Sequence, residues 1–351
     1  MTQNGRQRLQ AEKDNSNLSV PGIIVKKLLN TLCAVAALLL PVTGQAGVIR
    51  HDVNMQEHIA LAAAPQFDPV GRLLFSTSAG NWICSGTLIS ASFVLTAGHC
   101  LDDVTTSNVT FDVGGFTYSG AQWQVHASWN GDFLAGNDLA LLQLMGNVGN
   151  VTPASVYQGN DEVGAIGTHV GLGSSGNGLT GSTLGPGTKR AGNNRMDLVD
   201  STNVTGRTHS NIIWTDFDAP AGTLPSQGTG LYPSAAYLAD PLAYSLGITS
   251  GVALNLEYSI AGGDSGGGFF LQENNQWFLA GVHSFLAGID ASGPNASYGD
   301  LSGSIRVSSF ANWIDAAQGS AAVVPVPGAV WLLGSALGVL GALKRKVRVA
   351  A

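Results

Sequence analysis

The chain has 351 residues, of which 44% are hydrophobic and 11% are charged, so it can form one large domain or two around a substantial core. Its formal net charge of −7 is uneven, because residues 47–320 carry 7 basic and 21 acidic side chains. A body this acidic repels phosphate backbones, which argues against nucleic-acid binding, and 47 glycines with 13 prolines favour turns and short strands.

Residues 1–46 have the pattern of a secretory leader. Lys26 and Lys27 precede the apolar run 28–42, and small residues follow at positions 44 and 46. We expect export and cleavage after Ala46, although the stretch before Lys26 is long for a leader. Residues 47–72 would then form an N-terminal segment or a propeptide.

The cysteines fit an exported protein. Cys33 falls in the leader, so Cys84 and Cys100 remain as an even pair in an oxidising compartment. A bridge between them would contribute roughly 3 kcal/mol of stability.

Short apolar runs separated by Gly, Ser and Asn predict β-strands through the body of the chain. The predicted strands cover 73–76, 82–90, 93–97, 109–113, 139–144, 168–173, 211–217, 266–271, 277–285 and 304–310. Residues 310–318 predict a short helix with Phe310, Trp313 and Ile314 on one face. This pattern indicates an all-β barrel or sandwich. The Gly-, Ser- and Thr-rich stretch 172–230 is long for a loop, and its pieces cannot be assigned.

The C-terminal residues 321–351 have the pattern of a second targeting signal. Val324-Pro325-Val326-Pro327 precedes a 16-residue apolar run at 328–343, and four basic residues follow. The run is slightly shorter than the roughly 20 residues of a typical spanning helix. The segment resembles the PEP-CTERM class of bacterial sorting signals. The resemblance implies a Gram-negative exporter, transient anchoring in the inner membrane by a transmembrane segment at 328–343, an exosortase partner, and release or attachment at the cell surface. A plain C-terminal anchor is the alternative.

Three stretches of the body carry candidate chemistry, although each is ambiguous alone. His99 beside Cys100 could be a packed residue, Asp138 a turn residue, and the loop "AGGDSGGG" around Ser265 only a loop. Together they supply what acyl transfer needs. A serine hydroxyl requires a base to remove its proton, the imidazole requires a carboxylate partner, and the oxyanion requires backbone N–H groups that glycines leave accessible.

These motifs, in the order His99, Asp138, Ser265, resemble the chymotrypsin/trypsin family of serine proteases. "CSGTLIS…FVLTAGHC", "NDLALLQL", "GGDSGGG", "GLGS" and "VSSFANWI" carry the resemblance over about residues 73–317. It implies an all-β fold of two six-stranded antiparallel barrels, at about 73–155 and 160–317, with a short C-terminal helix, in a protease domain at 73–320. The active site would lie between the barrels.

The resemblance also implies roles for individual residues. Ser265 would be the nucleophile, His99 the general base and acid, and Asp138 its orienting partner. Gly263 and Ser265 would supply the oxyanion-hole N–H groups. Ser284 would support the aspartate and pair with substrate backbone, Phe285 would replace the usual Trp beside it, and the Cys84–Cys100 bridge would brace the histidine loop.

The sequence also departs from the family pattern at other points. No Ile-Val-Gly-Gly segment precedes Cys84, so activation by an amine buried against Asp264 is doubtful and that carboxylate needs another partner. Ala261 stands where a cysteine is common.

Two side chains bear on substrate choice. Ser259 stands at the expected pocket floor, where Asp would select Lys or Arg, so a basic P1 residue is not expected. His283 stands where glutamate-specific relatives bind the substrate carboxylate. The alternative is that His283 only packs in a strand, which leaves a small or apolar preference.

We therefore expect an exported serine endopeptidase that acts on proteins or peptides, without a cofactor or a metal motif, although a structural calcium ion is left open. A non-catalytic surface adhesin and an esterase on the same fold are the alternatives.

Overall fold

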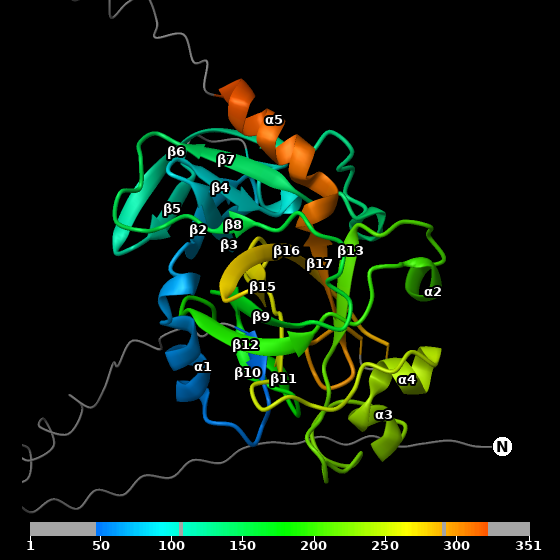
Figure 1. Ribbon diagram of the computed structural model, residues 1–351. Coiled ribbons are helices and arrows are strands. Elements are labelled where there is room, and N and C mark those ends of the chain that lie inside the picture. The colour runs from blue at the N-terminus through cyan, green and yellow to red at the C-terminus, as the bar shows by residue number, and fades with distance from the viewer. Residues whose placement is uncertain (1–46, 105–107, 290–292, 322–351) are drawn as a thin grey trace, which may run out of the picture. The chain divides into compact units, whose positions relative to one another are not determined.

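A closed antiparallel barrel of six strands forms the first half of the computed structural model, which describes residues 47–104, 108–289 and 293–321 (Figure 1). The strands pair around the barrel in the order β2-β3-β4-β7-β6-β5. They are β2 (Val70–Thr77), β3 (Gly80–Ser90), β4 (Phe93–Thr96), β5 (Thr110–Val113), β6 (Phe116–Val125) and β7 (Ala140–Leu144).

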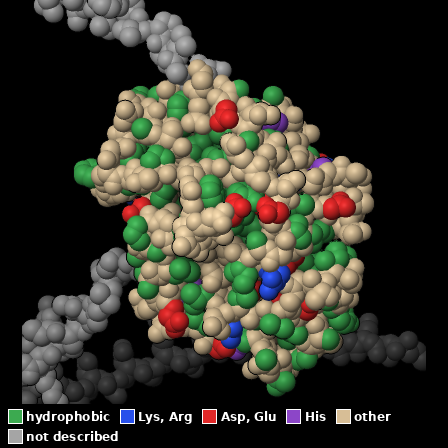
Figure 2. All heavy atoms as spheres, in the orientation of Figure 1, with side chains coloured by type: hydrophobic (Ala, Val, Ile, Leu, Met, Phe, Trp, Pro, Cys, Tyr) green, Lys and Arg blue, Asp and Glu red, His purple; other side chains and the backbone are tan. Residues whose placement is uncertain are grey.

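The barrel forms because alternate apolar residues of its strands point inward. Leu73, Leu88, Val94, Phe111 and Leu142 have no exposed surface and pack in one cluster. Side chains alternate between the two faces of a strand, so apolar residues at every second position fill the interior of the barrel. Charged groups are few and scattered on the face that Figure 2 shows.

The second half of the described chain contains a curled sheet of seven strands in place of a second closed barrel. Six strands follow the order β12-β9-β15-β16-β17-β13, and β8 pairs in parallel with β16. They are β8 (Ser155–Val156), β9 (Ile166–Gly171), β12 (Arg190–Arg195), β13 (Ile212–Asp216), β15 (Gly268–Glu273), β16 (Gln276–Ala287) and β17 (Leu301–Arg306). The edge strands β12 and β13 do not pair along their lengths. One isolated bridge between Leu198 and Trp214 joins the chain after β12 to β13.

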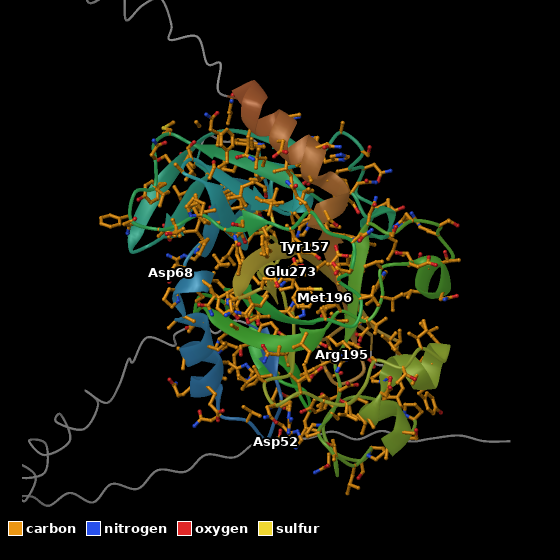
Figure 3. All side chains as sticks on the ribbon, viewed as in Figure 1. Asp52, Asp68, Tyr157, Arg195, Met196 and Glu273 are labelled. Atoms are coloured by element: carbon orange, nitrogen blue, oxygen red, sulfur yellow. A yellow bond between two sulfur atoms is a disulfide. The ribbon has the colours of Figure 1, made fainter. Side chains whose placement is uncertain are left out.

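The all-β fold predicted from the sequence is therefore confirmed, with an open second sheet. Several clusters of buried residues hold this half together. In one of them Met196 and Tyr157, labelled in Figure 3, pack in the same cluster as Phe269. Another is shared with the barrel, because Leu95 and Leu141 of the barrel belong to the same cluster as residues of β9, β15, β16 and β17. This shared core fixes the two halves against each other.

A third, four-stranded sheet was not expected. Its order is β11-β10-β1-β14, with β1 (Gly47–Ile49), β10 (Ser175–Asn177), β11 (Gly181–Leu184) and β14 (Tyr258–Ser259). Val48 is fully buried and pairs with Ser259, so the segment after the expected leader cleavage point is built into the fold. A propeptide role for residues 47–72 stays a prediction.

Helices cover the sheets at their margins. They are α1 (Met55–Ala62), α2 (Thr202–Thr205), α3 (Ala235–Ala239), α4 (Pro241–Leu246) and α5 (Ala311–Ala321). In α5, as predicted, Ile314 is buried, and Phe310 lies just before the helix in the same shared cluster. In the part of the chain described, no helix combines the length and the apolarity needed to cross a bilayer. The expected leader and the apolar run 328–343 lie outside the described residues.

Candidate active site

His99 lies in a short 3-10 turn (Gly98–Cys100) directly after β4, and a disulfide holds that turn. Cys84 on β3 and Cys100 are bonded, as predicted, so the turn is fixed to the neighbouring strand. The Cys100 sulfur lies 3.8 Å from His99 Nε2 and 3.9 Å from the carbonyl oxygen of Ser265. The expected base and nucleophile residue therefore flank the same disulfide.

The Asp138 carboxylate is fully buried and accepts three hydrogen bonds. The backbone N–H of His99 donates to Oδ1 at 2.7 Å, and His99 Nδ1 donates to Oδ2 at 2.7 Å. The Ser284 hydroxyl donates to Oδ2 at 2.5 Å. Because a carboxylate only accepts, the imidazole carries its proton on Nδ1, which leaves Nε2 of neutral His99 as a base.

Ser284 reaches Asp138 because its strand is irregular at that point. In the pairing of β16 with β17, His283 lies opposite Ser304 and Phe285 lies opposite Gly303, so Ser284 is an extra residue in the strand. A bulge of this kind re-aims one side chain out of the regular alternation. The bulge directs this hydroxyl to the carboxylate, and the supporting role of Ser284 stays a prediction.

The loop that contains Ser265 approaches the barrel closely. Gly266 has φ +82, and a Cβ there would lie 2.1 Å from Thr96 Oγ1 and 2.2 Å from the Ser85 carbonyl oxygen. Ser265 is half-buried, and no hydrogen bond joins its hydroxyl to His99 among the described residues. Such contacts are often loose before substrate binds.

In this loop the backbone N–H groups of Gly262, Gly263 and Ser265 have no acceptor within the described residues, and those of Gly263 and Ser265 flank Asp264. The groups on either side of Ser265 are occupied. Asp264 N–H donates to the Ala261 carbonyl at 2.9 Å, and Gly266 N–H donates to the His283 carbonyl at 2.8 Å. Two free donors beside the candidate nucleophile can bind a developing oxyanion.

Asp264 has partners other than a terminal amine. Its Oδ1 accepts from Gly173 N–H at 2.7 Å, and its Oδ2 accepts from Ala261 N–H at 2.9 Å and from the Tyr258 hydroxyl at 3.5 Å. Burial raises the pKa of this carboxyl to about 7. A Cβ on Gly173 would lie 2.3 Å from the Asp264 backbone nitrogen, so the approach requires glycine there. None of these partners could be identified from the sequence.

Aromatic rings form one wall beside His99. The Phe133 ring centroid lies 5.3 Å from the imidazole centroid, and Trp129 lies 6.5 Å from it. Phe285 lies 5.9 Å from Phe133 and 5.4 Å from the buried Trp214. These rings limit the access of water to the imidazole while its side chain stays 24% exposed.

Ser259 and His283, the expected specificity residues, are more deeply buried than His99. Ser259 is fully buried, with its hydroxyl oxygen 3.3 Å from that of Ser302 on β17. His283 is also fully buried, and its Nε2 lies 3.0 Å from Nδ1 of His169. His169 stacks on Phe269 with centroids 3.8 Å apart. Burial lowers the pKa of His283 to about 3 and the pKa of His169 well below its usual value, so both are neutral.

The partner His169 was missed in the sequence, where it stood in a predicted strand without a ligand-like spacing. The three candidate metal ligands that converge in the described part of the chain are Cys84, His99 and Cys100. Because the two cysteines form the disulfide, this group offers no thiolates. The structural calcium ion stays an open expectation.

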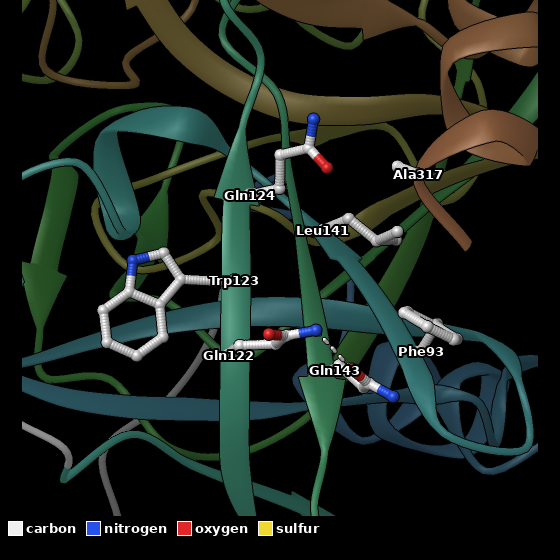
Figure 4. Close-up of a pocket in the computed structure, with 7 residues that line it drawn as sticks. All are labelled: Phe93, Gln122, Trp123, Gln124, Leu141, Gln143 and Ala317. Carbon is white, nitrogen blue, oxygen red and sulfur yellow. Dashed lines mark hydrogen bonds between the residues drawn. The ribbon is translucent and has the colours of Figure 1, made fainter. Parts of the chain in front are cut away.

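A cavity of about 330 Å³ lies between β6, β7 and α5 (Figure 4). Its lining residues are Phe93, Gln122, Trp123, Gln124, Leu141, Gln143 and Ala317. None of them is titratable or nucleophilic, and Gln122 already donates to Gln143 at 2.7 Å. This cavity therefore does not carry the chemistry.

The family and fold comparisons agree with this geometry. Residues 62–223 match the model of the Trypsin family. This stretch is therefore similar to the Trypsin family. A solved structure titled HL collagenase has a similar fold, with a TM-score of 0.50 and 21% identity over 73% of this chain and 96% of that chain.

Three curated proteins match shorter stretches of the chain. They are duodenase-1 of Bos taurus (37% identity, 32% of this chain and 44% of the relative), chymotrypsin of Phaedon cochleariae (29%, 22% and 30%) and chymotrypsin-C of Bos taurus (40%, 17% and 26%). The chain thus spans between about a quarter and under half the length of the curated relatives it matches.

Proposed function

We propose that this protein is a serine endopeptidase that hydrolyses peptide bonds through an acyl-enzyme on Ser265. The observation that carries the proposal is the buried Asp138 carboxylate, which binds His99 twice and leaves Nε2 of that residue as a base beside the nucleophile loop. The two free N–H groups of Gly263 and Ser265 support the same chemistry.

In the first half of the reaction, Ser265 Oγ attacks the peptide carbonyl carbon while His99 Nε2 takes the hydroxyl proton. The imidazolium is stabilised by Asp138, and the oxyanion is bound by the N–H groups of Gly263 and Ser265. When the intermediate collapses, the C–N bond breaks and His99 returns the proton to the leaving amine. The acyl group stays on Ser265 as an ester.

In the second half, water attacks the ester carbonyl and His99 takes its proton. Collapse of the second intermediate breaks the bond to Ser265 Oγ, which recovers a proton from His99. The new carboxylic acid then leaves, and the starting state is restored.

For the side chain before the cut bond, we propose that a basic residue is excluded, because no carboxylate stands at Ser259. A glutamate preference would require His283, which is fully buried and already bonded to His169. That burial favours a small or apolar preference over glutamate.

We further propose that the protein is exported and sorted to the surface of a Gram-negative cell. This part depends on the sequence of the leader and of residues 321–351. An exosortase would be the partner of the tail, and the inner membrane would hold the tail before processing.

Turnover of a mixed peptide library, read by mass spectrometry, tests the activity and the cleavage preference together. Cleavage by the parent and not by Ser265→Ala supports the proposal. Ester turnover without peptide turnover would make the protein an esterase, and no turnover of either by the folded, processed chain would favour an adhesin. Cleavage after Glu that disappears in His283→Val would restore the glutamate preference.

A further inference from the structure

Hydrogen bonds hold the nucleophile loop at four consecutive carbonyl groups, those of residues 262–265. The Gly262 oxygen accepts from Ser174 N–H at 2.7 Å, and the Asp264 oxygen accepts from Gly267 N–H at 2.7 Å. A trans peptide places its C=O and N–H on opposite sides. Holding the Gly262 and Asp264 oxygens therefore aims the N–H groups of Gly263 and Ser265 the other way, into the open site.

The remaining two carbonyl groups of this stretch are both held by Ser85. Its backbone N–H donates to the Ser265 oxygen at 2.7 Å, and its hydroxyl donates to the Gly263 oxygen at 3.0 Å. Gly263 has φ +93, and a glycine rotates freely unless its neighbouring peptides are fixed. The Ser85 hydroxyl thus restrains the peptide that separates the two oxyanion donors.

The direction of this hydroxyl is determined by its other contact. Ser85 Oγ also accepts from Leu172 N–H at 3.0 Å. Because that N–H can only donate and the Gly263 carbonyl can only accept, the hydroxyl proton must point to Gly263. Ser85 is fully buried, and its own carbonyl accepts from Thr96 Oγ1 at 2.8 Å. The anchor is therefore itself fixed.

Ser85 also connects the two halves of the site. It follows Cys84 of the disulfide on β3 in the barrel, whereas Gly263, Ser265 and Leu172 belong to the second half of the chain. We infer that the Ser85 side chain is a positioning residue that sets the oxyanion hole against the His99–Asp138 pair. This inference depends on the proposed serine peptidase activity.

The test compares Ser85→Ala with Thr87→Val in the full chain. Thr87 lies two residues along the same strand, is fully buried, and its hydroxyl has no partner among the described residues, so Val removes a hydroxyl without removing a hydrogen bond. If Ser85→Ala does not fold, Ser85→Cys replaces it, because a thiol of similar size is a much weaker donor.

The readouts are kcat, KM and the affinity of a peptidyl trifluoromethyl ketone, all referred to enzyme titrated at the active site. Ser265 Oγ bonds to the ketone carbon of this probe, and the resulting oxyanion occupies the hole. Loss of one oxyanion donor costs about 10²–10³ in kcat. For misaligned donors we expect a smaller loss, about tenfold in kcat and in probe affinity, with KM within about twofold and Thr87→Val unchanged.

A merely structural role for Ser85 would lower the melting temperature and leave kcat per titrated site and probe affinity unchanged, which would overturn the inference. A parent enzyme that neither cleaves peptide nor binds the probe would contradict the proposed function, and the inference with it. The two failures are therefore distinguishable.

Discussion

Asp138 and His99 are joined by two hydrogen bonds of 2.7 Å, one to the histidine backbone and one to its ring. The backbone bond places the residue, and the ring bond selects the tautomer. The carboxylate therefore sets both the position and the tautomer of the candidate base.

Asp138→Asn removes the charge and keeps the size of the side chain. Because an amide can donate to the ring and stabilise the wrong tautomer, we expect kcat to fall about 10⁴-fold with KM nearly unchanged. Steady-state kinetics measure this. Asp132→Asn, which breaks the exposed pair with Arg207, is the matched control and should retain activity. Equal losses in the two variants would rule out a special role for Asp138.

Ser284→Ala removes the third hydrogen bond to Asp138. A hydrogen bond to a charged group contributes about 1.5–3 kcal/mol, so part of this should appear as a loss of about tenfold in kcat/KM. Ser308→Ala is a suitable control, because its hydroxyl also donates to a buried carboxylate, that of Glu162, outside the site. If Ser284→Ala keeps full kcat/KM, the hydrogen bond from Ser284 to Asp138 is not required for activity.

Removal of the Cys84–Cys100 bridge by a double Ala substitution should destabilise the fold. The bridge closes a loop with a sequence separation of 16, for which the chain-entropy effect is about 3 kcal/mol. Urea unfolding of parent and variant measures the difference. Reduction of the parent should reproduce it, and a change below about 0.5 kcal/mol would contradict the expected bracing of the histidine turn.

Stability should fall as the pH rises above neutral. Burial and the neighbouring Asp216 raise the pKa of Asp218 to about 11, and burial raises the pKa of Glu257 well above its usual value. The folded state therefore holds protons that the unfolded state releases from about pH 4 upward, and each such group removes up to about 1.4 kcal/mol per pH unit until its folded pKa is reached.

Buried histidines make the free energy of unfolding rise with pH, but only at acidic pH. The pKa of His58 is lowered by burial to about 4, so its effect on stability is complete by about pH 6.5. Between pH 7 and 9, burial of Lys189, which lowers its pKa to about 8, also opposes the fall in stability, so comparison of the parent with a carboxyl variant is needed to isolate the carboxyl. Asp218→Asn should flatten the fall of the free energy of unfolding in that window, as measured by denaturant titration at each pH, and an unchanged slope would show that Asp218 is not protonated in the fold.

The strands that contain long apolar runs were predicted from the sequence, and strands without such runs were missed. β3 and β16 carry long apolar runs and were expected, whereas β6 exposes much of its Thr, Gln and aromatic surface and was missed. β1 has only three residues and forms through its pairing with β10 and β14, so no local sequence pattern predicts it. Whether the second sheet closes depends on whether its edge strands β12 and β13 pair, and these strands stand at opposite ends of its strand order. Local periodicity does not predict such a pairing.

The candidate site divides in the same way. His99, Asp138 and Ser265 were predicted because acyl transfer needs these three residue types together and because the motifs around them resemble a known family. Ser85 and His169 act only through contacts across the fold, and each looks like an ordinary strand residue in the sequence. Tertiary contacts of this kind are what the sequence alone could not provide.

The most direct test of the central claim is fluorophosphonate labelling of the processed chain, with the modified residue located by peptide mass spectrometry. We predict one label, on Ser265, that is absent in Ser265→Ala and formed much more slowly in Asp138→Asn. A folded parent that takes up no label, or is labelled at another serine, would contradict the account.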